Sequence, residues 1–415
     1  MMIKESLRTP GCFFKTKYLI TALLCMLLIS CASSDKHRHE VRGAGHDRTV
    51  NGQEYNEAGH HIVAALSSGN AEVFNKAIHK KTLLDRTFQD MPRDSHIVTK
   101  ARASLDPVLD QAGIIMTRNL RENTQLTFVR SRFVKGEHRA LVRVNMGDRG
   151  LSYIDFVLGK DEESRVKIID WHDYAQGQLY SDSLRQALVL MLPHDKTLTA
   201  QLFGGATIDK KSAGQFSELA RLSKGKNYTQ WMENYNDLPE KLKYSRTILV
   251  TRALIASAMG SDSEYRRALK DVNTYYGDDP TLSLMLIDHY FNERDYRAAH
   301  RALDRLHEYT GGDAAIDFLR ANICLAEKNY HQSTKYAQIA IRQDSTFENA
   351  YLTLLIGSVY SKQFEITVNT LEHLEFNFGY EFEPDEIARL GGYEEFSRSF
   401  IFAAWKADRM SLTGR

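Results

Sequence analysis

The 415-residue sequence contains only four cysteines, Cys12, Cys25, Cys31 and Cys324, and their spacing forms no metal-binding motif. The first three lie in or beside an N-terminal segment with the features of a targeting signal, so the folded part of the chain keeps only Cys324. A single cysteine excludes a framework of internal disulfides. Because Cys324 lies between two apolar residues on a predicted helix, we expect it to be a small buried side chain.

The sequence also lacks an excess of charge of either sign and lacks known catalytic motifs. Its 54 Lys and Arg residues face 53 Asp and Glu residues, so no net field attracts nucleic acid, which we do not expect as a partner. No nucleophile elbow, phosphate loop, zinc motif or paired-carboxylate motif occurs. We therefore expect a protein that is not an enzyme and that holds no cofactor and no metal.

The N-terminus has basic residues followed by an apolar run, Tyr18–Ile29, which is too short to span a bilayer comfortably but fits a signal-peptide core. The run ends in Leu28-Ile29-Ser30-Cys31, which resembles the lipobox of bacterial lipoproteins. The resemblance implies a signal peptide over 1–30 and lipidation of Cys31, the new N-terminus. Ala32 stands where the inner-membrane retention signal is usually Asp, which implies the outer membrane, facing the periplasm. The alternative is a cleaved signal with an incidental cysteine.

The residues from 31 to 54 are polar, lack apolar periodicity and are expected to form a disordered tether behind the lipid anchor. Three histidines in this segment, His37, His39 and His46, could bind metal weakly. A solvated linker explains them better, because no second cluster of ligands nearby completes a site.

The segment 55–195 combines helical and strand-like patterns. Helices are predicted first, then four strands joined by short polar turns, then a closing helix; the predicted ranges are Tyr55–Leu66, Asn70–Leu84, about Ser104–Arg121, Leu126–Val134, His138–Asn145, Leu151–Leu158, Val166–His172 and Ser181–Met191. Short turns imply an antiparallel meander. This order resembles the NTF2-like α+β fold, in which helices lie on a curved antiparallel sheet and enclose a pocket. Many members only bind or dimerise, which leaves a homodimer open.

Three polar residues of the predicted sheet are candidates for a pocket: Asp155 on the third strand, and Asp170 and His172 on the fourth. Asp170 and His172 share a face because side chains two residues apart in a strand point the same way. Such a pair could act as a general base and the group that orients it. The alternative is that these residues are polar simply because they lie at strand ends on the rim of the sheet.

A 34-residue repeat follows a predicted linker at 196–211. The tags Arg294-Asp295-Tyr296, Lys328-Asn329-Tyr330 and Lys362-Gln363-Phe364 recur, and small residues come three positions after each aromatic, at Ala299, Ser333 and Thr367. The pattern resembles the tetratricopeptide (TPR) family, whose repeats are pairs of helices that stack into a solenoid. Weaker units are expected upstream, at Lys226–Trp231 and at Tyr265, which precedes Tyr296 by a 31-residue step. We predict about five helix pairs over 212–375; an irregular helical bundle is the alternative.

In the TPR family the first helices of successive repeats line a groove that binds a partner. The resemblance places Asp288, Phe291, Phe318 and Asn322 in this groove, although some of these side chains could merely pack between helices. The residues 376–415 are expected to cap the array, with a helix over about Tyr393–Lys406. Its predicted apolar stripe contains Phe396, Phe400, Ala403 and Ala404.

Taken together, the sequence predicts an α+β domain followed by an all-α solenoid in a lipoprotein of the bacterial outer membrane. The first functional hypothesis is a scaffold or adaptor in the periplasm that binds a protein partner through its groove and the membrane through its lipid. The second hypothesis is an enzyme or small-molecule-binding protein that uses the pocket of the NTF2-like domain. The absence of catalytic motifs favours the scaffold.

Overall fold

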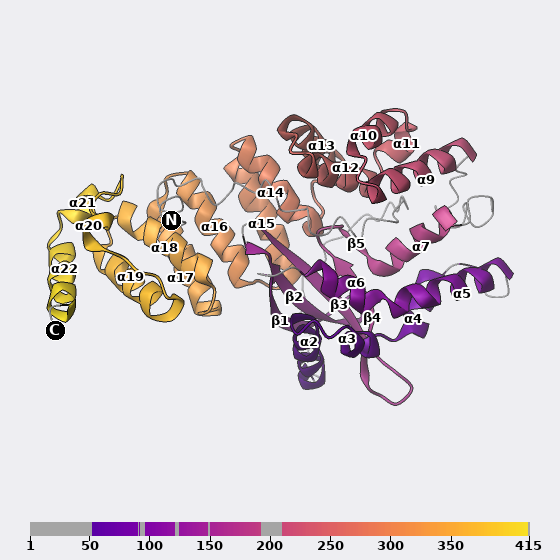
Figure 1. The fold of residues 1–415 in the computed structure, drawn as a ribbon, viewed down its shortest axis with the longest axis horizontal. Coiled ribbons are helices and arrows are strands. Elements are labelled where there is room, and N and C mark those ends of the chain that lie inside the picture. Colours follow the sequence, from indigo (N-terminus) through magenta and orange to yellow (C-terminus); the bar gives the residue numbers. More distant parts are fainter. Residues whose placement is uncertain are drawn as a thin grey trace. The chain divides into compact units, whose positions relative to one another are not determined.

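The computed structural model describes residues 52–89, 91, 96–120, 124–147, 150–191 and 210–413. The expected signal peptide, Cys31, most of the tether and the linker as far as residue 209 lie outside these residues. The chain divides into two compact units, one ending at Met285 and the other continuing from Leu286 (Figure 1). None of the helices in the described ranges combines the length and apolarity needed to cross a bilayer. The expected order, an α+β region followed by helices, is confirmed.

An antiparallel five-stranded sheet forms part of the unit that ends at Met285, and its strands are neighbours in sequence order (Figure 1). They are β1 (Gln125–Val134), β2 (Glu137–Asn145), β3 (Leu151–Lys160), β4 (Val166–Asp173) and β5 (Gln178–Leu179). The first four confirm the predicted meander and lie close to the predicted ranges. The fifth was not predicted, because two residues are too few to show an alternating pattern.

The two faces of this sheet differ in chemistry, because side chains alternate along each strand. One face carries apolar residues such as Val142 and Ile154, which belong to the main hydrophobic core. The opposite face carries charged residues that are also buried, among them Arg139 and Asp155. Helices pack against the strands from before and after the sheet in sequence; they are α2 (Gly52–Ser67), α3 (Ala71–Ala77), α4 (Lys80–Thr87) and α7 (Tyr180–Met191).

The helix predicted over Asn70–Leu84 is two helices, α3 and α4. Asn70 caps the first as expected, since its side chain accepts a hydrogen bond from the amide of Val73 at 3.1 Å. The chain then leaves the helix at Ile78, which forms a parallel bridge with Ile168 of β4. The amide of His79 donates to the carbonyl of Ile168 at 2.8 Å. Pairing with the sheet edge therefore breaks a helix that its own apolar pattern would continue.

The helix predicted over about Ser104–Arg121 is also two helices, α5 (His96–Asp110) and α6 (Ala112–Asn119). Asn75 of α3 holds the break between them. Its side-chain nitrogen donates to the carbonyl of Asp110 at 2.7 Å, and its side-chain oxygen accepts from the amide of Gly113 at 2.7 Å. One side chain thus satisfies backbone groups on both sides of the break, which local sequence could not reveal.

Helix pairs make up most of the described residues from Lys210 to Phe378. The first two pairs, α9 (Lys210–Lys224) with α10 (Tyr228–Asn236) and α12 (Arg246–Ala258) with α13 (Asp262–Tyr276), belong to the unit that ends at Met285. Their residues Trp231 and Ile248 share a hydrophobic core with residues of the sheet. The short segments α11 (Glu240–Lys243) and η3 (Pro280–Leu282) complete this unit.

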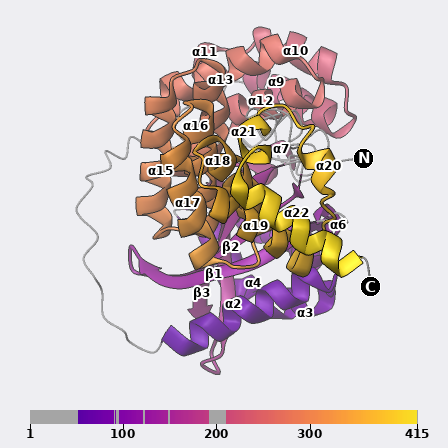
Figure 2. The ribbon, with the colours of Figure 1, turned by 90° about the vertical axis from the view of Figure 1, so that its left-hand side faces the viewer.

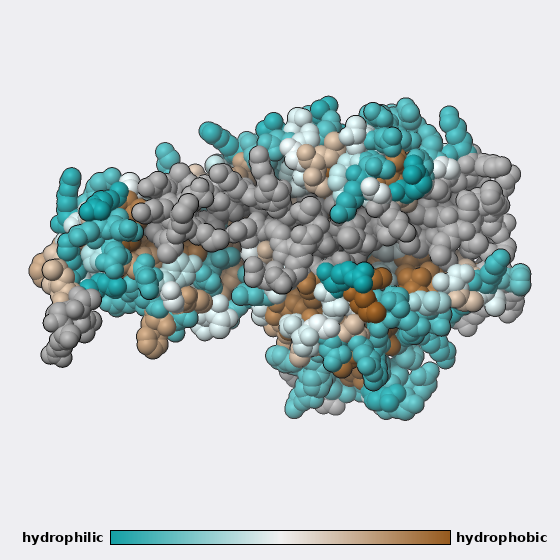
Figure 3. Space-filling view, in the orientation of Figure 1, coloured by the Kyte–Doolittle hydropathy of each residue, from teal (hydrophilic) through white to brown (hydrophobic). Residues whose placement is uncertain are grey.

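The second unit contains three further pairs and a C-terminal region. The elements are α14 (Ser283–Asn292), whose first residues precede the division at Met285, then α15 (Tyr296–Thr310), α16 (Ala314–Ala326), α17 (Tyr330–Gln343), α18 (Glu348–Tyr360), α19 (Phe364–Phe378), α20 (Pro384–Ile387), α21 (Glu394–Ser397) and α22 (Phe400–Thr413). Helices α15 to α18 pack side by side in sequence order (Figure 2). Most of the coloured residues in Figure 3 are hydrophilic, and the hydrophobic ones among them gather in separate patches.

The backbone keeps a 34-residue period through all five pairs. The second helix of each pair begins at Tyr228, Asp262, Tyr296, Tyr330 and Phe364, and the first helix of each pair ends at Lys224, Ala258, Asn292, Ala326 and Tyr360. The turn between the two helices holds one residue with a left-handed backbone at the same position each time: Lys226, Gly260, Arg294, Lys328 and Lys362. A left-handed residue ends one helix and redirects the chain into the next.

The expected 31-residue step to Tyr265 is wrong, because the backbone keeps the same period here as elsewhere. The position equivalent to Tyr296 is Asp262, and Tyr265 instead occupies the position of Ala299. The apolar position seven residues after each helix start is buried in every pair, at Tyr235, Leu269, Leu303, Ala337 and Leu371. The second pair therefore keeps the packing position although it has lost the aromatic tag.

The C-terminal helix predicted over about Tyr393–Lys406 is two helices, α21 and α22. Ser399 interrupts it: its hydroxyl accepts from the amide of Phe402 at 3.1 Å, which caps α22. The break turns the predicted stripe, so Phe396 stays buried but Phe400 is 83% exposed. Phe402 and Trp405 are buried in the place of Phe400 and its helical neighbours.

Candidate functional site

The structure brings the three pocket candidates onto one face of the sheet. Asp155 of β3 pairs directly with His172 of β4, and Val157 pairs with Asp170 two residues earlier. The prediction that Asp170 and His172 share a face is therefore supported, and Asp155 joins them across the strand. Both aspartates are fully buried, so the interpretation of these side chains as an exposed rim does not apply to them.

Asp170 accepts hydrogen bonds on both of its carboxylate oxygens. Oδ2 receives the hydroxyl of Ser181 at 2.6 Å and Nε of Arg86 at 3.0 Å. Oδ1 receives the backbone amides of Ser181 at 3.1 Å and Trp171 at 2.9 Å. Burial raises the pKa of Asp170, whereas the bonds from Ser181 and the charge of Arg86 act in the opposite direction. The carboxylate thus joins β4, α4 and the start of α7.

Asp155 is held by two arginines. Oδ2 accepts from Nη2 of Arg132 at 2.6 Å and from Nη1 of Arg139 at 3.3 Å. Arg139 also contacts Glu137 at 2.7 Å, and Glu137 contacts Arg86 at 2.7 Å. Burial alone would raise the pKa of Glu137, but hydrogen bonds from Arg86 and Arg139 hold it below its ordinary value.

These contacts form one continuous chain of ion pairs, which we call the charged network: Arg132, Asp155, Arg139, Glu137, Arg86 and Asp170. A general base needs an oxygen that can accept a proton from substrate. Both oxygens of Asp170 and Oδ2 of Asp155 already accept hydrogen bonds, whereas Oδ1 of Asp155 is buried and has no hydrogen-bond partner among the described residues. The arrangement therefore fits structural cross-linking, with Oδ1 of Asp155 as the one oxygen of these two carboxylates that is still able to accept a proton.

His172 is neutral at ordinary pH. Burial, and then the charge of Arg246, lower its pKa to about 4. Its Nε2 atom is buried and has no hydrogen-bond partner. The pKa of the next residue, Asp173, shifts in the opposite direction. Burial raises it to about 6, although hydrogen bonds from Ala175 and Gln176 act to lower it. A histidine with so low a pKa is a weak base near neutrality.

The predicted groove residues lie on the first helices of two successive pairs, and three of them are buried: Asp288, Phe318 and Asn322. Asn322 accepts a hydrogen bond from the hydroxyl of Thr353 on α18 at 3.2 Å. Phe318 packs edge-on against Phe347, with ring centroids 5.2 Å apart. Phe318 and Asn322 thus pack between helices of the array, as the alternative to a partner-binding role predicts.

The ring of Phe291, the fourth predicted groove residue, meets Tyr296 at a centroid distance of 5.9 Å. Phe291 is only partly buried. Among the predicted groove residues it is the one whose side chain keeps appreciable exposure, so it is the best position for a surface variant.

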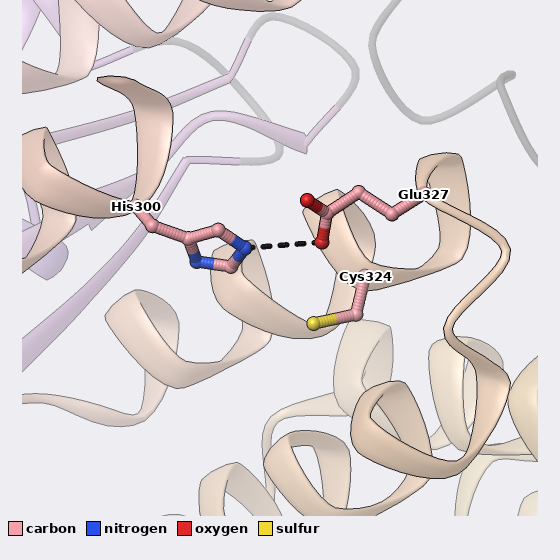
Figure 4. Close-up of side chains that lie close together, drawn as sticks. All are labelled: His300, Cys324 and Glu327. Atoms are coloured by element: carbon pink, nitrogen blue, oxygen red, sulfur yellow. Dashed lines mark hydrogen bonds and ion pairs between the residues drawn. The ribbon is translucent and has the colours of Figure 1, made fainter. Parts of the chain in front are cut away.

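Three potential metal ligands that the sequence did not single out together lie at the contact between α15 and α16 (Figure 4). They are His300 of α15, Cys324 of α16 and Glu327 directly after α16. Nε2 of His300 is 3.2 Å from Oε2 of Glu327. The expectation that Cys324 is a buried helical residue agrees with its exposure of 2%. Burial, and then the charge of Glu327, raise the pKa of its thiol to about 12, so the free thiol is a poor nucleophile.

No family model, no curated protein and no solved structure matches this chain.

Proposed function

We propose that this chain is a lipid-anchored scaffold or adaptor protein of the bacterial cell envelope whose helix pairs bind a protein partner. The observation that carries the proposal is the unbroken 34-residue spacing of helix starts and ends through five pairs. This spacing is that of tetratricopeptide repeats, which present the first helices of successive pairs to a partner peptide or helix. Burial of the position seven residues into each second helix supports the same interpretation.

The sheet region fits an NTF2-like domain with a binding or dimerising role. Support comes from the meander order of its strands and from the helices that precede and follow them. The charged network argues against the alternative of an enzyme, because the carboxylates of Asp155 and Asp170 are bound to arginines. The neutral, weakly basic His172 gives the same indication.

Lipidation of Cys31 fixes the proposed location on the periplasmic face of the outer membrane. We expect the Cys31→Ser variant to lose incorporation of radiolabelled palmitate completely and to remain unprocessed or leave the outer-membrane fraction. Several acyl chains on one cysteine give stable anchoring, whereas their loss leaves only a polar tether. Labelling followed by membrane fractionation measures both effects. Cys12→Ser and Cys25→Ser are the matched controls, and labelling that survives in Cys31→Ser would refute the lipobox assignment.

Partner binding is tested by cross-linking the full-length lipoprotein in intact envelopes and identifying captured proteins by mass spectrometry. The groove variant is Phe291→Ala, which truncates the partly exposed aromatic ring and leaves Asp288, Phe318 and Asn322 unchanged. We expect it to lower capture of a specific partner about tenfold or more, because truncation of an aromatic side chain that acts as a hot spot costs about 2 kcal/mol or more.

The matched control is Arg301→Ala/Lys335→Ala. These two residues are exposed and occupy the same repeat position on α15 and α17, one period apart. Capture should equal that of the native protein, and far-ultraviolet circular dichroism should be unchanged in both variants. If the groove variant captures the same proteins in the same amounts as the control, the groove does not bind the partner.

A further inference from the structure

The cluster of His300, Cys324 and Glu327 combines three different ligand types at one place. A ligating atom from each, a ring nitrogen, the thiol sulfur and a carboxylate oxygen, lies within 4.8 Å of the other two. Figure 4 shows the histidine and the glutamate facing each other with the thiol beside them. Cys324 is buried, whereas the side chains of His300 and Glu327 are 28% and 29% exposed. The cluster is therefore buried on the side of the cysteine and open to solvent on the side of the other two ligands.

The next repeat supplies an internal comparison. The positions one period further on are Thr334, Ser358 and Ser361, at the contact between α17 and α18. There too the outer two residues approach each other, with 3.5 Å between the hydroxyl oxygens of Thr334 and Ser361. The repeat geometry thus brings the two outer positions together by itself, while the hydroxyl of Ser358 bonds to Thr367 at 2.9 Å. At the contact of α15 with α16 they are filled by histidine, cysteine and glutamate in place of hydroxyl groups.

We propose that His300, Cys324 and Glu327 bind one divalent transition-metal ion of the zinc class. Zinc accepts nitrogen, thiolate and carboxylate ligands together, at about 2.0 to 2.3 Å, in a tetrahedral arrangement. Three protein ligands leave the fourth position to water or to a group from another molecule. The mixed set with a thiolate disfavours Mg²⁺ and Ca²⁺, which prefer oxygen ligands alone.

The geometry needs little adjustment to accept the ion. Tetrahedral ligands at these bond lengths are about 3.3 to 3.8 Å apart. The 3.2 Å between His300 and Glu327 already matches this spacing. The remaining separations, at most 4.8 Å, close through side-chain rotation of the two partly exposed residues. Because His300 belongs to one helix pair and Cys324 to the next, the ion would cross-link successive pairs and stiffen the array at that point.

Cobalt(II) is the probe for this site, because a thiolate bound to cobalt gives a near-ultraviolet charge-transfer band and a tetrahedral site gives intense visible bands. We expect titration of the full chain, kept reduced, to produce both at one equivalent, and Zn²⁺ to displace them. Because the charge-transfer band needs the thiolate, Cys324→Ser should abolish it. Loss of a group that only supports a ligand weakens metal binding by about 10–100-fold, and loss of a ligand itself should cost more. His300→Ala should therefore weaken Zn²⁺ binding by more than about 100-fold.

Two controls make the assignment specific. Ser358→Ala alters the equivalent position of the next repeat and should leave the titration unchanged. Cys31→Ser removes a thiol outside the described residues and should leave the charge-transfer band intact. Should Cys324→Ser lose its circular-dichroism spectrum, Glu327→Gln keeps the buried thiol and should still lower Zn²⁺ affinity at least tenfold. A native chain without the charge-transfer band, or a band that persists in Cys324→Ser, would overturn the proposal. Neither result depends on whether the repeats bind a protein.

Discussion

Asp170→Ala is expected to lower the free energy of unfolding of the sheet-containing unit by about 3–5 kcal/mol. Asp170 is fully buried and accepts hydrogen bonds from Arg86, Ser181 and the amide of Trp171. Alanine removes the acceptor but leaves the guanidinium of Arg86 in place, with its side chain only 24% exposed. Arg86 then keeps only its ion pair with Glu137, and the hydroxyl and amide of Ser181 lose their acceptor, so the cost is that of breaking a buried, hydrogen-bonded ion pair.

Urea titration followed by tryptophan fluorescence measures this effect, since Trp171 is adjacent in sequence and stacks on Tyr180 at a centroid distance of 3.9 Å. The matched control is Glu163→Ala, which removes an exposed partner of Arg165 from the same unit. Exposed pairs contribute less than about 1 kcal/mol, so this variant should be nearly silent. Adding Arg86→Leu to Asp170→Ala should recover part of the lost stability, because both members of the pair are then gone.

The contrary result would be an Asp170→Ala variant as stable as Glu163→Ala. It would mean that the charged network contributes little to holding α4, β4 and α7 together. The case for a structural role of Asp170 would then fall, and the alternative of a functional carboxylate in the sheet region would regain support.

The sheet could be predicted from sequence because its signals are local. Alternation of apolar and polar residues and the short polar turns fix strands such as Glu137–Asn145, and short turns force antiparallel neighbours. The same period of two placed Asp170 and His172 on one face. The partners of these residues were not predictable, because Arg86 lies 84 residues before Asp170 in the chain. Nothing in either local segment indicates the pairing.

Helix existence was predictable, whereas helix interruptions were not. The breaks after Ala77 and at Gln111 depend on bonds to distant backbone groups, from His79 to Ile168 and from Asn75 to Asp110. Apolar periodicity continues through both breaks, because the residues on each side face the same core. Hydrogen bonds between distant segments set these helix boundaries, so the pattern within one segment could not predict them.

The repeats show the opposite relation between sequence and structure. The 34-residue period is visible in the aromatic tags, but the second pair carries Asp262 in the tag position, and Tyr265 misled the count by three residues. The fully buried Leu269 was the better marker, because packing constrains that position more strongly than the tag position, whose aromatic residues are only partly buried. The same register, once applied to His300 and Cys324, would have placed these two residues at one contact between successive pairs.

The shifted pKa values of His172 and Asp173 predict two opposing effects of pH on the stability of the fold. His172 has a pKa of about 4 in the fold against an ordinary 6.5, so the native state binds its proton less tightly and loses stability as pH falls below 6.5. Asp173 has a pKa of about 6 against 3.8, so the native state binds its proton more tightly and gains stability as pH falls below 6. Each contribution amounts to about 2 kcal/mol at pH 4.5.

Single variants should separate the two contributions. His172→Gln leaves only the aspartate effect, and its stability should rise by about 2 kcal/mol, relative to the native chain, between pH 7 and pH 4.5. Asp173→Asn leaves only the histidine effect and should fall by a similar amount. Urea titrations over this pH range measure both, and the difference between the two variants cancels every titrating group that they share. Parallel profiles would show that neither side chain is shifted as burial requires, and the treatment of His172 as a neutral, weakly basic residue would have to be abandoned.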